Sequence, residues 1–380
     1  MKIVYVSRSI IPSRTANSIN VMRMCEAFAS LGHEVTLLAP WTKKLEEKGV
    51  NDYFDYYGVS KNFELKKLYS PNIKYLKKRI YSIRSLFEIR KINPDLVYGR
   101  DDMFTFFLSQ INGFRVLFEQ HEPFYKNDFQ HKIFKKFINN KKNNNKIATI
   151  SDKLKYIYSE KYNIPLNLIL VIQSATILNN DINTIPKGCE KFKSMLNVGY
   201  IGSLFKGRGI EIIIKLSLEF PEINFHVIGG KKNDIEYWLN SSKNTKNLIF
   251  HGFIEPEKTY QYRNMCDILI APYQTNEEGN RNSEYMSPIK VFEYMASKKA
   301  IICSDLPAIR ESISEEHAIL VDNKDIKAWI KALRDLINSP EKRKKLGESA
   351  FLHCKDNFTY KARCKKILFF MFNKDIDNIN

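Results

Sequence analysis

The sequence predicts an α/β protein of two domains, each built around a parallel β-sheet. Three observations lead to this fold class. Strands alternate with helices along the chain, which is the pattern of parallel sheets with helical crossovers. The alternation starts afresh after a polar segment that contains Pro and Gly, residues 177–194. The length of 380 residues is enough for two domains with their own hydrophobic cores.

The first alternating series occupies the N-terminal half. An apolar strand is predicted at residues 2–7, and a loop, RSIIPSRTAN, follows it. Residues 18–33 are predicted to be helical because their apolar side chains recur at helical spacing and Gly32 stops the run. Further strands, with helical stretches between them, are predicted at 34–40, 95–100, 114–121 and 146–151.

The second series follows the polar segment. Strands are predicted at 196–203, 223–230, 247–254, 267–273 and 300–305, and helices at 208–222, 325–339 and 359–374. We therefore expect two facing Rossmann-like domains, with ligands bound at the carboxyl ends of the strands and in a deep cleft between the domains. The predicted boundaries are 1–176 for the N-terminal domain, 177–194 for a linker, 195–357 for the C-terminal domain and 358–380 for a final helix that crosses back to the N-terminal domain.

The composition argues against several classes of protein. Hydrophobic residues make up 44% and charged residues 27% of the chain, as in soluble globular proteins. No apolar run reaches the roughly 18 residues of a membrane span, and the N-terminal MKIVYVS lacks the apolar core of a signal peptide. The six cysteines form no CxxC pair and no zinc-site spacing, so we expect reduced thiols in a cytoplasmic protein.

The chain has a formal net charge of +18, and most of this net charge lies in its first half. Residues 1–170 hold 29 Lys and Arg against 16 Asp and Glu, whereas residues 171–380 hold 31 against 26. The excess lies mainly in two runs with interleaved aromatic residues, 72–92 and 131–146. Such runs could bind an anionic membrane surface or nucleic acid, or could simply form a solvated surface.

The stretch MSPIKVFEYMASKKA predicts a helix with an anion site at its start. Ser287 is a good N-cap and Pro288 suits the first helical position. The backbone N–H groups of Ile289 and Lys290 would have no partner within the helix and could bind an anion. The anion would also offset the unfavourable placement of a cation, Lys290, at the positive end of the helix dipole. Glu293 shares a face with Lys290, and sugar hydroxyls would satisfy its carboxylate. A surface ion pair between Lys290 and Glu293 is the alternative.

A second strand-to-helix turn, YIGSLFKGRGIE, repeats this arrangement upstream. Gly202, Gly207 and Gly209 let the backbone approach a ligand closely. Lys206 and Arg208 supply cations just before the helix. Two such turns indicate a site that binds a diphosphate from two sides. Arg208 can bind two phosphate oxygens at once. The turns match neither a Walker loop nor GxGxxG, so ATP hydrolysis and NAD binding lack their usual signatures.

These motifs resemble those of the retaining glycosyltransferases of family GT4, which have the GT-B fold. Over residues 195–340 the resemblance rests, in order, on NVGYIGSLFKGRGIEIII, HVIGG, NLIFHGFI, DILIAPY, SPIKVFEYMASKKAIICSD and AILV. The first half resembles the family more loosely, through GHEVTLLAP, DLVYGR, EQHE and ATISD. The resemblance covers most of the chain and implies the GT-B fold.

The resemblance implies a donor site in the second half. The family's Lys falls on Arg208, whereas its Arg falls on Ser203. Lys290 stands where the family usually has an apolar residue, so we expect it to replace the cation lost at Ser203. The expected donor-binding residues are Gly202, Ser203, Arg208, Phe253, Ser287, Pro288, Ile289, Lys290 and Glu293, with the base read near HGFI.

The family's two glutamates fall on Tyr285 and Glu293. By resemblance, Glu293 would hold the donor ribose. The first glutamate is missing, and Glu284, one residue before Tyr285, is a candidate to replace it.

The resemblance also implies active-site residues in the first half. His121, in FEQHEP, falls on the family's active-site histidine and would lie near the transferred sugar. Ala16 and Asn17, in SRTANSIN, would approach the donor phosphates or the acceptor, and Arg100 is expected to contact the acceptor. The expected catalytic residues are His121, Arg208, Lys290 and Glu293.

The function predicted by resemblance is transfer of a sugar from a nucleoside-diphosphate sugar, expected to be UDP-linked, with retention of anomeric configuration. A glycan or lipid-linked acceptor in bacterial envelope polysaccharide, lipopolysaccharide, capsule or glycolipid synthesis is expected. The basic first half would place the protein on the cytoplasmic face of an anionic membrane. We expect no metal, no other cofactor and no nucleic-acid partner. The open alternatives are a sugar-nucleotide epimerase of the same fold and a basic nucleic-acid-binding protein.

Overall fold

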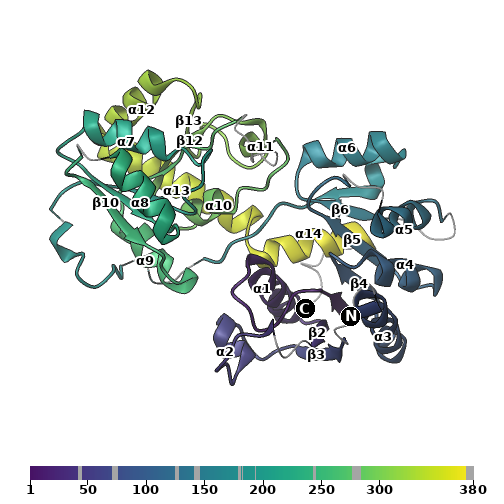
Figure 1. The fold of residues 1–380 in the computed structure, drawn as a ribbon. Helices are drawn as coiled ribbons and strands as arrows, with labels where there is room; N and C mark the ends of the chain where they lie inside the picture. The colour runs from purple at the N-terminus through teal and green to yellow at the C-terminus, as the bar shows by residue number, and fades with distance from the viewer. Residues whose placement is uncertain are drawn as a thin grey trace. The chain divides into compact units, whose positions relative to one another are not determined.

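A computed structural model of the chain describes residues 1–41, 45–70, 76–124, 128–140, 146–178, 181, 183–192, 194–242, 245–275 and 284–373. The predicted basic runs therefore lie partly outside the described residues. The chain divides into two compact units (Figure 1). The first unit contains Met1–Ile172 and Tyr360–Asn380, and the second contains Gln173–Thr359.

The first unit is a parallel sheet of seven strands with helices between them. Its strand order is β3-β2-β1-β4-β5-β6-β7. The strands are β1 (Lys2–Val6), β2 (Glu34–Trp41), β3 (Glu64–Tyr69), β4 (Leu96–Gly99), β5 (Val116–Gln120), β6 (Ile147–Thr149) and β7 (Ile169–Val171). The helices are α1 (Ala16–Ser30), α2 (Tyr53–Tyr57), α3 (Leu76–Ile92), α4 (Met103–Ile111), α5 (Phe129–Ile138), α6 (Asp152–Tyr162), the short η2 (Leu166–Leu168) and α14 (Tyr360–Phe372).

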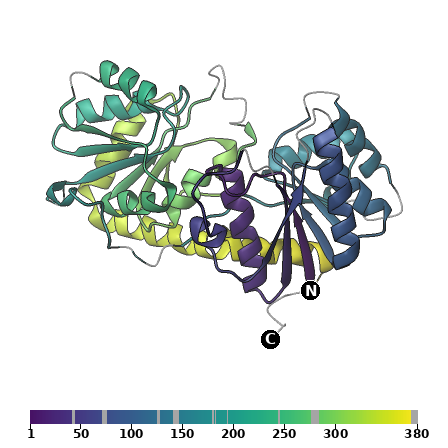
Figure 2. The ribbon, with the colours of Figure 1, turned by 60° about the horizontal axis from the view of Figure 1, so that its bottom comes forward.

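One face of this sheet is covered by α1 together with α14, the last helix of the chain. Ile3 and Tyr5 of β1 pack in one buried cluster with side chains of both helices. The equally buried Val4 and Val6 point to the opposite face, because side chains alternate along a strand. Figure 2 shows the purple helix α1 on one side of the first strands and the blue helices on the other. The yellow helix α14 thus completes the core of a unit whose other elements come from the start of the chain (Figure 1).

The second unit is a parallel sheet of six strands in the order β10-β9-β8-β11-β12-β13. The strands are β8 (Asn197–Ile201), β9 (Asn224–Ile228), β10 (Leu248–Gly252), β11 (Ile268–Ala271), β12 (Ala300–Ser304) and β13 (Ile319–Val321). The helices are α7 (Ile210–Glu219), α8 (Lys232–Ser241), α9 (Thr259–Met265), α10 (Ile289–Met295), α11 (Pro307–Arg310), α12 (Ile326–Asn338) and α13 (Pro340–Asn357), with the short η3 (Glu190–Phe192) and η4 (Pro256–Lys258). Two buried clusters form its core.

The strand register places chemically active loops at the carboxyl edge of each sheet. In the first unit Val6 pairs with Gly99, and Gly99 pairs with Phe118, so β1, β4 and β5 end side by side. In the second unit Ile201 at the end of β8 pairs with Ile228 at the end of β9. The residues that follow these strands are those that the sequence analysis selects.

The structure differs from the sequence predictions at the expected linker. The passage between the units comes after Ile172, and the polar segment 177–194 belongs to the second unit. The side chain of Asn264 donates hydrogen bonds to the carbonyl oxygens of Asp181 and Thr184, at 3.0 and 3.1 Å. Cys189 is buried in the core of the same unit. The Pro and Gly content of segment 177–194 correctly indicated an irregular loop. It did not indicate a linker, because an irregular loop can pack on one domain as readily as it can connect two.

Several elements were missed or misplaced in the sequence predictions. The edge strand β3 is half-exposed, with the polar sequence ELKKLY, and so has no strong apolar pattern. The strands β7 and β13 have only three residues each. Helix α7 begins at Ile210, not at residue 208, because Gly209 has a left-handed φ of 78° at its N-cap. None of the described helices is both long and apolar enough to cross a membrane.

Candidate functional site

Two glycine-rich turns of the second unit pack directly against each other. The N–H of Gly202, after β8, donates to the carbonyl of Ile228 at 2.9 Å, and the N–H of Gly229, after β9, donates to that of Gly252 at 2.7 Å. A Cβ atom at Gly229 would lie 2.2 Å from the carbonyl oxygen of Gly202. Glycine is therefore required here so that the two backbones can meet.

Lys290, on α10, extends over this glycine turn into an aromatic setting. Its Nζ lies 3.7 Å from the centroid of the Tyr200 ring and 5.0 Å from that of Tyr273. A Cβ atom at Gly202 would lie 2.9 Å from this Nζ. Among the described residues, no hydrogen bond or ion pair links Lys290 to a carboxylate. The ammonium thus lies against two aromatic rings and forms no ion pair within the described part of the chain.

Arg208 also lies near Tyr273. Its guanidinium carbon is 5.7 Å from the ring centroid of Tyr273, and its side chain makes no hydrogen bond or ion pair within the described part of the chain. Burial and the nearby charge of Arg208 lower the pKa of Lys290 well below its usual range, and Glu293 opposes this shift only in part. An anion between the two cations would favour the charged form of Lys290. The fold thus brings together the two cations that the sequence analysis selects.

Glu293 lies one turn further along α10 and faces a different partner. Its carboxylate is 3.6 Å from Nη1 of Arg263, a nearly buried side chain of α9. The expected alternative, a Lys290–Glu293 ion pair, is not formed. Glu293 is also 35% exposed, so it is more accessible than the apolar sequence around it indicated. It lines a pocket together with Ile177, Tyr260, Arg263, Asn264, Ala296 and Ser297. An accessible carboxylate fits a hydroxyl-bearing ligand.

The start of α10 differs from its predicted form. Pro288 takes the N-cap position and the helix begins at Ile289. The Ser287 hydroxyl does not cap the helix, because it accepts a hydrogen bond from the backbone N–H of Ser174 at 2.7 Å. The N–H of Ile289 donates to the carbonyl of Ser287 at 3.0 Å, so this amide is not open to an anion. The prediction that the Ile289 and Lys290 amides are both available to an anion is therefore wrong for Ile289.

The remaining predicted donor-site residues lie at the same edge of the sheet. The Ser203 carbonyl accepts a hydrogen bond from the Tyr200 hydroxyl at 2.6 Å. Phe253 follows β10 and is 63% exposed. Tyr285, which stands in place of the first glutamate, is buried, whereas Glu284 is exposed.

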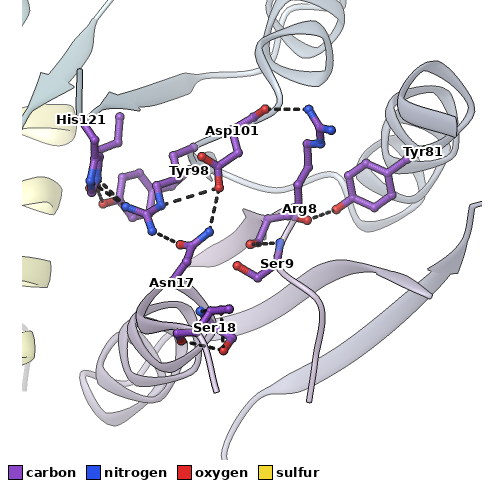
Figure 3. A network of polar contacts seen from close by, with 12 residues as sticks. Arg8, Ser9, Asn17, Ser18, Tyr81, Tyr98, Asp101 and His121 are labelled. Atoms are coloured by element: carbon purple, nitrogen blue, oxygen red, sulfur yellow. Dashed lines mark hydrogen bonds and ion pairs between the residues drawn. The ribbon is translucent and has the colours of Figure 1, made fainter. Parts of the chain in front are cut away.

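A polar cluster joins the predicted residues of the first unit (Figure 3). Arg100, after β4, has Nη1 2.7 Å from Nδ1 of His121, which follows β5. Arg100 also donates to the Asn17 side-chain oxygen. The Asn17 amide donates to the Asp101 carboxylate at 2.9 Å, and Arg8 donates to the Asp101 carbonyl at 3.2 Å. The fold thus assembles Asn17, Arg100 and His121, and adds Arg8 and Asp101.

Ala16, the last of the predicted acceptor-side residues, is the first residue of α1 and is exposed. It takes no part in the hydrogen bonds of the polar cluster, because its side chain has no polar atom.

A buried carboxylate stands behind His121. Glu119 contacts Nε2 of His121, accepts a hydrogen bond from Tyr98, and pairs with Nη2 of Arg363 at 2.8 Å. Burial alone would raise the pKa of Glu119, but Arg363, His121 and Arg100 more than offset this effect and hold it well below its usual range. Burial lowers the pKa of His121, although Glu119 opposes this shift. The result is an ionised Glu119 beside a neutral imidazole.

Arg363, Asp101 and Arg8 were missed by the sequence reasoning. Arg363 lies 244 residues from Glu119 in the sequence, and the only local signal was an arginine in an otherwise amphipathic final helix. Asp101 has a left-handed φ of 74°, which no sequence pattern revealed. Within the described residues, no group of three or more His, Cys, Asp and Glu side chains could hold a metal ion.

Two family models match this chain. The model described as "Glycosyl transferases group 1" matches residues 181–353, and the model described as "Glycosyltransferase Family 4" matches residues 19–176. An uncharacterised glycosyltransferase of Methanocaldococcus jannaschii is 26% identical over 184 residues, which cover 47% of this chain and 45% of that protein. The alpha-galactosylglucosyldiacylglycerol synthase of Streptococcus pneumoniae is 24% identical over 135 residues, 34% of each chain. This chain thus spans less than half the length of these two relatives.

Solved structures share the fold over the whole chain. A glycosyltransferase from Rickettsia africae has a TM-score of 0.71 at 16% identity, covering 100% of this chain and 99% of that chain. Anabaena HepE, solved in complex with UDP-glucose, has a TM-score of 0.68 at 13% identity, covering 98% and 100%. The fold of this chain is therefore GT-B.

Proposed function

Because the chain belongs to the glycosyltransferases of the GT-B type, we propose that it transfers a sugar from a nucleoside-diphosphate sugar to a glycan or lipid-linked acceptor. One observation carries this proposal. Arg208 and Lys290 both lie near the ring of Tyr273, at 5.7 and 5.0 Å from its centroid, and no described carboxylate pairs with either cation. A bound diphosphate would supply the missing negative charge.

The chemistry follows from where charge develops during transfer. As the bond between the sugar and the diphosphate breaks, negative charge grows on the departing phosphate oxygen. Cations that are already in place stabilise this charge without reorganisation. Arg208 can hold two phosphate oxygens at once, whereas Lys290 acts as a point charge. The partly exposed carboxylate of Glu293 would accept hydrogen bonds from the ribose hydroxyls, which fixes the donor.

The finer assignments extend the same proposal. Transfer proceeds with retention, UDP is the nucleotide, and no metal or other cofactor takes part. His121 lies near the transferred sugar, and Asn17 and Arg100 contact the acceptor. HepE has been solved with UDP-glucose, which supports the choice of UDP. An inverted anomeric configuration in the product, read by NMR, would contradict retention.

The proposed acceptor is a lipid-linked sugar or glycolipid of a bacterial envelope, at the cytoplasmic face of the membrane. Two observations support this choice. The first 170 residues carry the larger part of the net positive charge, and a relative of this chain is named as a synthase of a diacylglycerol glycolipid. A basic surface is attracted to anionic headgroups.

The donor site is tested first by calorimetry with UDP, GDP, ADP, CMP and their sugars. We expect UDP and a UDP-sugar to bind, and Glu293→Ala and Arg208→Ala to weaken this binding. Lys290→Met keeps the packing on Tyr200 but removes the charge, so UDP affinity should fall roughly tenfold or more, since a hydrogen bond to a charged group contributes about 1.5–3 kcal/mol.

Lys298→Met is the matched control. Lys298 follows α10, is exposed, and lies 3.9 Å from Glu348 on the surface, so its loss should leave UDP affinity unchanged. Wild-type affinity in Lys290→Glu, or no nucleotide binding by the wild type, would contradict the assigned site.

A further inference from the structure

The buried ion pair between Arg363 and Glu119 is unusual because it lies entirely in the interior of the first unit. The side chains are 2% and 1% exposed, and their charged atoms are 2.8 Å apart. Burying two charges removes both from water, and well-packed apolar residues often stabilise a protein equally well or better. Stability alone therefore gives little reason for an arginine and a glutamate at these positions.

The pair is connected to the proposed active site through a single carboxylate. Oε1 of Glu119 contacts both Nη2 of Arg363 and Nε2 of His121. The other oxygen of Glu119 accepts a hydrogen bond from the Tyr98 hydroxyl. Arg363 also approaches the Ile172 carbonyl at 3.4 Å, and it enters from α14, which packs on α1. Both ends of the carboxylate are thus held by elements that are distant in the sequence.

We propose that Arg363 is a positioning residue for His121: it holds the Glu119 carboxylate ionised and in place, and that carboxylate fixes the tautomer of the imidazole. This inference rests on the proposed role of His121 in sugar transfer. It adds a residue from the C-terminal helix to the machinery of the first unit.

The tautomer follows from the hydrogen-bond partners. An ionised carboxylate only accepts, so Nε2 of His121 must carry the proton that lies between it and Glu119. Nη1 of Arg100 lies 2.7 Å from Nδ1 and 2.9 Å from Nε2. Because Nε2 is protonated towards Glu119, the lone pair that can accept from Arg100 is that of Nδ1. A hydroxyl of the transferred sugar can take the place of Arg100 as donor to Nδ1. The neutral imidazole thereby becomes an acceptor aimed at the substrate.

Loss of Arg363 should reverse this arrangement. Without the guanidinium, a buried Glu119 favours its protonated form, because burial disfavours a charge without a partner. A protonated carboxyl can donate to Nε2, and the imidazole proton then moves to Nδ1. The lone pair that faces the substrate would be lost, although every residue of the site itself remains.

The experiment compares Arg363→Met with the wild type by ¹⁵N NMR of the histidine side chains and by steady-state kinetics. The His121 resonances are assigned from their absence in His121→Gln. In the wild type we expect a protonated Nε2 and a bare Nδ1. In Arg363→Met we expect the protonated nitrogen to change, and kcat to fall roughly tenfold to a hundredfold with KM for UDP-sugar unchanged. Arg363→Lys should restore both in part.

Cys364→Ala is the matched control, because it removes a buried side chain next to Arg363 on the same helix without touching Glu119. It should lower the melting temperature but leave the His121 tautomer and kcat unchanged. If Arg363→Met fails to fold, the double variant Glu119→Gln/Arg363→Met replaces it. The double variant leaves no unpaired charge in the interior, and it should also lower kcat.

An unchanged tautomer together with an unchanged kcat in the folded variant would overturn the proposal. His121→Ala separates this failure from that of the proposed function. Full transfer activity in His121→Ala would remove the role of His121 in transfer, whereas the NMR comparison would still decide whether Arg363 holds its tautomer.

Discussion

At the scale of single residues, two imidazoles of the second unit share one buried hydrogen-bond chain. Nε2 of His226 is 3.0 Å from Oδ1 of Asn197, and Nδ1 of His226 is 2.9 Å from Nε2 of His251. The Asn197 amide donates to two backbone carbonyls, so its oxygen is the acceptor for His226. His226 therefore carries its proton on Nε2 and accepts from His251 at Nδ1, so this chain requires a neutral His226.

This chain predicts a loss of stability in mild acid. Burial lowers the pKa of His226 to about 3 and that of His251 to about 4. In the unfolded chain both titrate near 6.5, so between about pH 6.5 and pH 4 the unfolded state binds more protons than the folded state. Stability is thus fully present above about pH 6.5 and falls as the pH drops, by up to about 1.4 kcal/mol per pH unit for each ring.

The measurement is the melting temperature at pH 7.5 and pH 5 for the wild type and for His226→Gln/His251→Gln. We expect a smaller drop in the double variant, because the two titrating rings are gone. An equal drop in both proteins would show that other groups carry the acid sensitivity.

At the scale of elements, the site of the second unit depends on how closely its loops can approach. Gly209 caps α7 with a φ of 78°, and a Cβ there would lie 1.9 Å from the carbonyl oxygen of Pro272, after β11. The N–H of Gln274 also donates to the Gly207 carbonyl at 3.0 Å. The loops after β8 and β11 are therefore locked together, and this contact fixes the segment that carries Arg208.

The element-scale prediction compares two glycine substitutions in the same unit. Gly188 has a φ of 84°, and a Cβ atom added there would have no atom of a non-adjacent residue within 4 Å. Gly188→Ala should therefore lower the free energy of unfolding only by the cost of a left-handed backbone, about 1–2 kcal/mol. Gly209→Ala adds the clash with Pro272 and should lower the melting temperature further and weaken UDP binding. Melting curves and calorimetry on both variants test this. Equal effects at the two positions would mean that the loop contact does not hold the site.

At the scale of the whole molecule, the net charge of +18 favours binding to an anionic surface. Helix α3 offers the best candidate for first contact. Its exposed side chains include Ile83 and Phe87, 45% and 62% exposed, among the exposed Arg84, Arg90 and Lys91. Basic residues attract anionic headgroups, and exposed apolar side chains can enter the interface.

Vesicle flotation tests this membrane contact. The wild type should float with phosphatidylglycerol vesicles at low salt but not with phosphatidylcholine vesicles, and about 0.5 M salt should release it, since salt screens exposed charges. Ile83→Ser/Phe87→Ser should float less. Leu352→Ser is the control, because Leu352 is 57% exposed on α13 of the other unit. No flotation by the wild type at low salt would remove the membrane from the proposed function.

The sequence by itself determined those features that depend on neighbours along the chain. The alternation of apolar strands with helices predicted two parallel sheets, because hydrophobic periodicity is a local property. The same local logic selected Arg208 and Lys290, since each is a cation next to a helix start. His121 and Arg100 came from the family resemblance, and each lies at the end of a predicted strand, where residues of a parallel sheet meet at one edge.

Only the tertiary structure decided which side chains became partners. Glu293 pairs with Arg263 and not with Lys290, the Ser287 hydroxyl binds the Ser174 amide and not the helix start, and Glu119 pairs with Arg363. Each partner comes from another element, so no spacing in the sequence reveals it. The physical reason is that a buried polar group must find its partner wherever packing places one, and packing is settled by the fold as a whole.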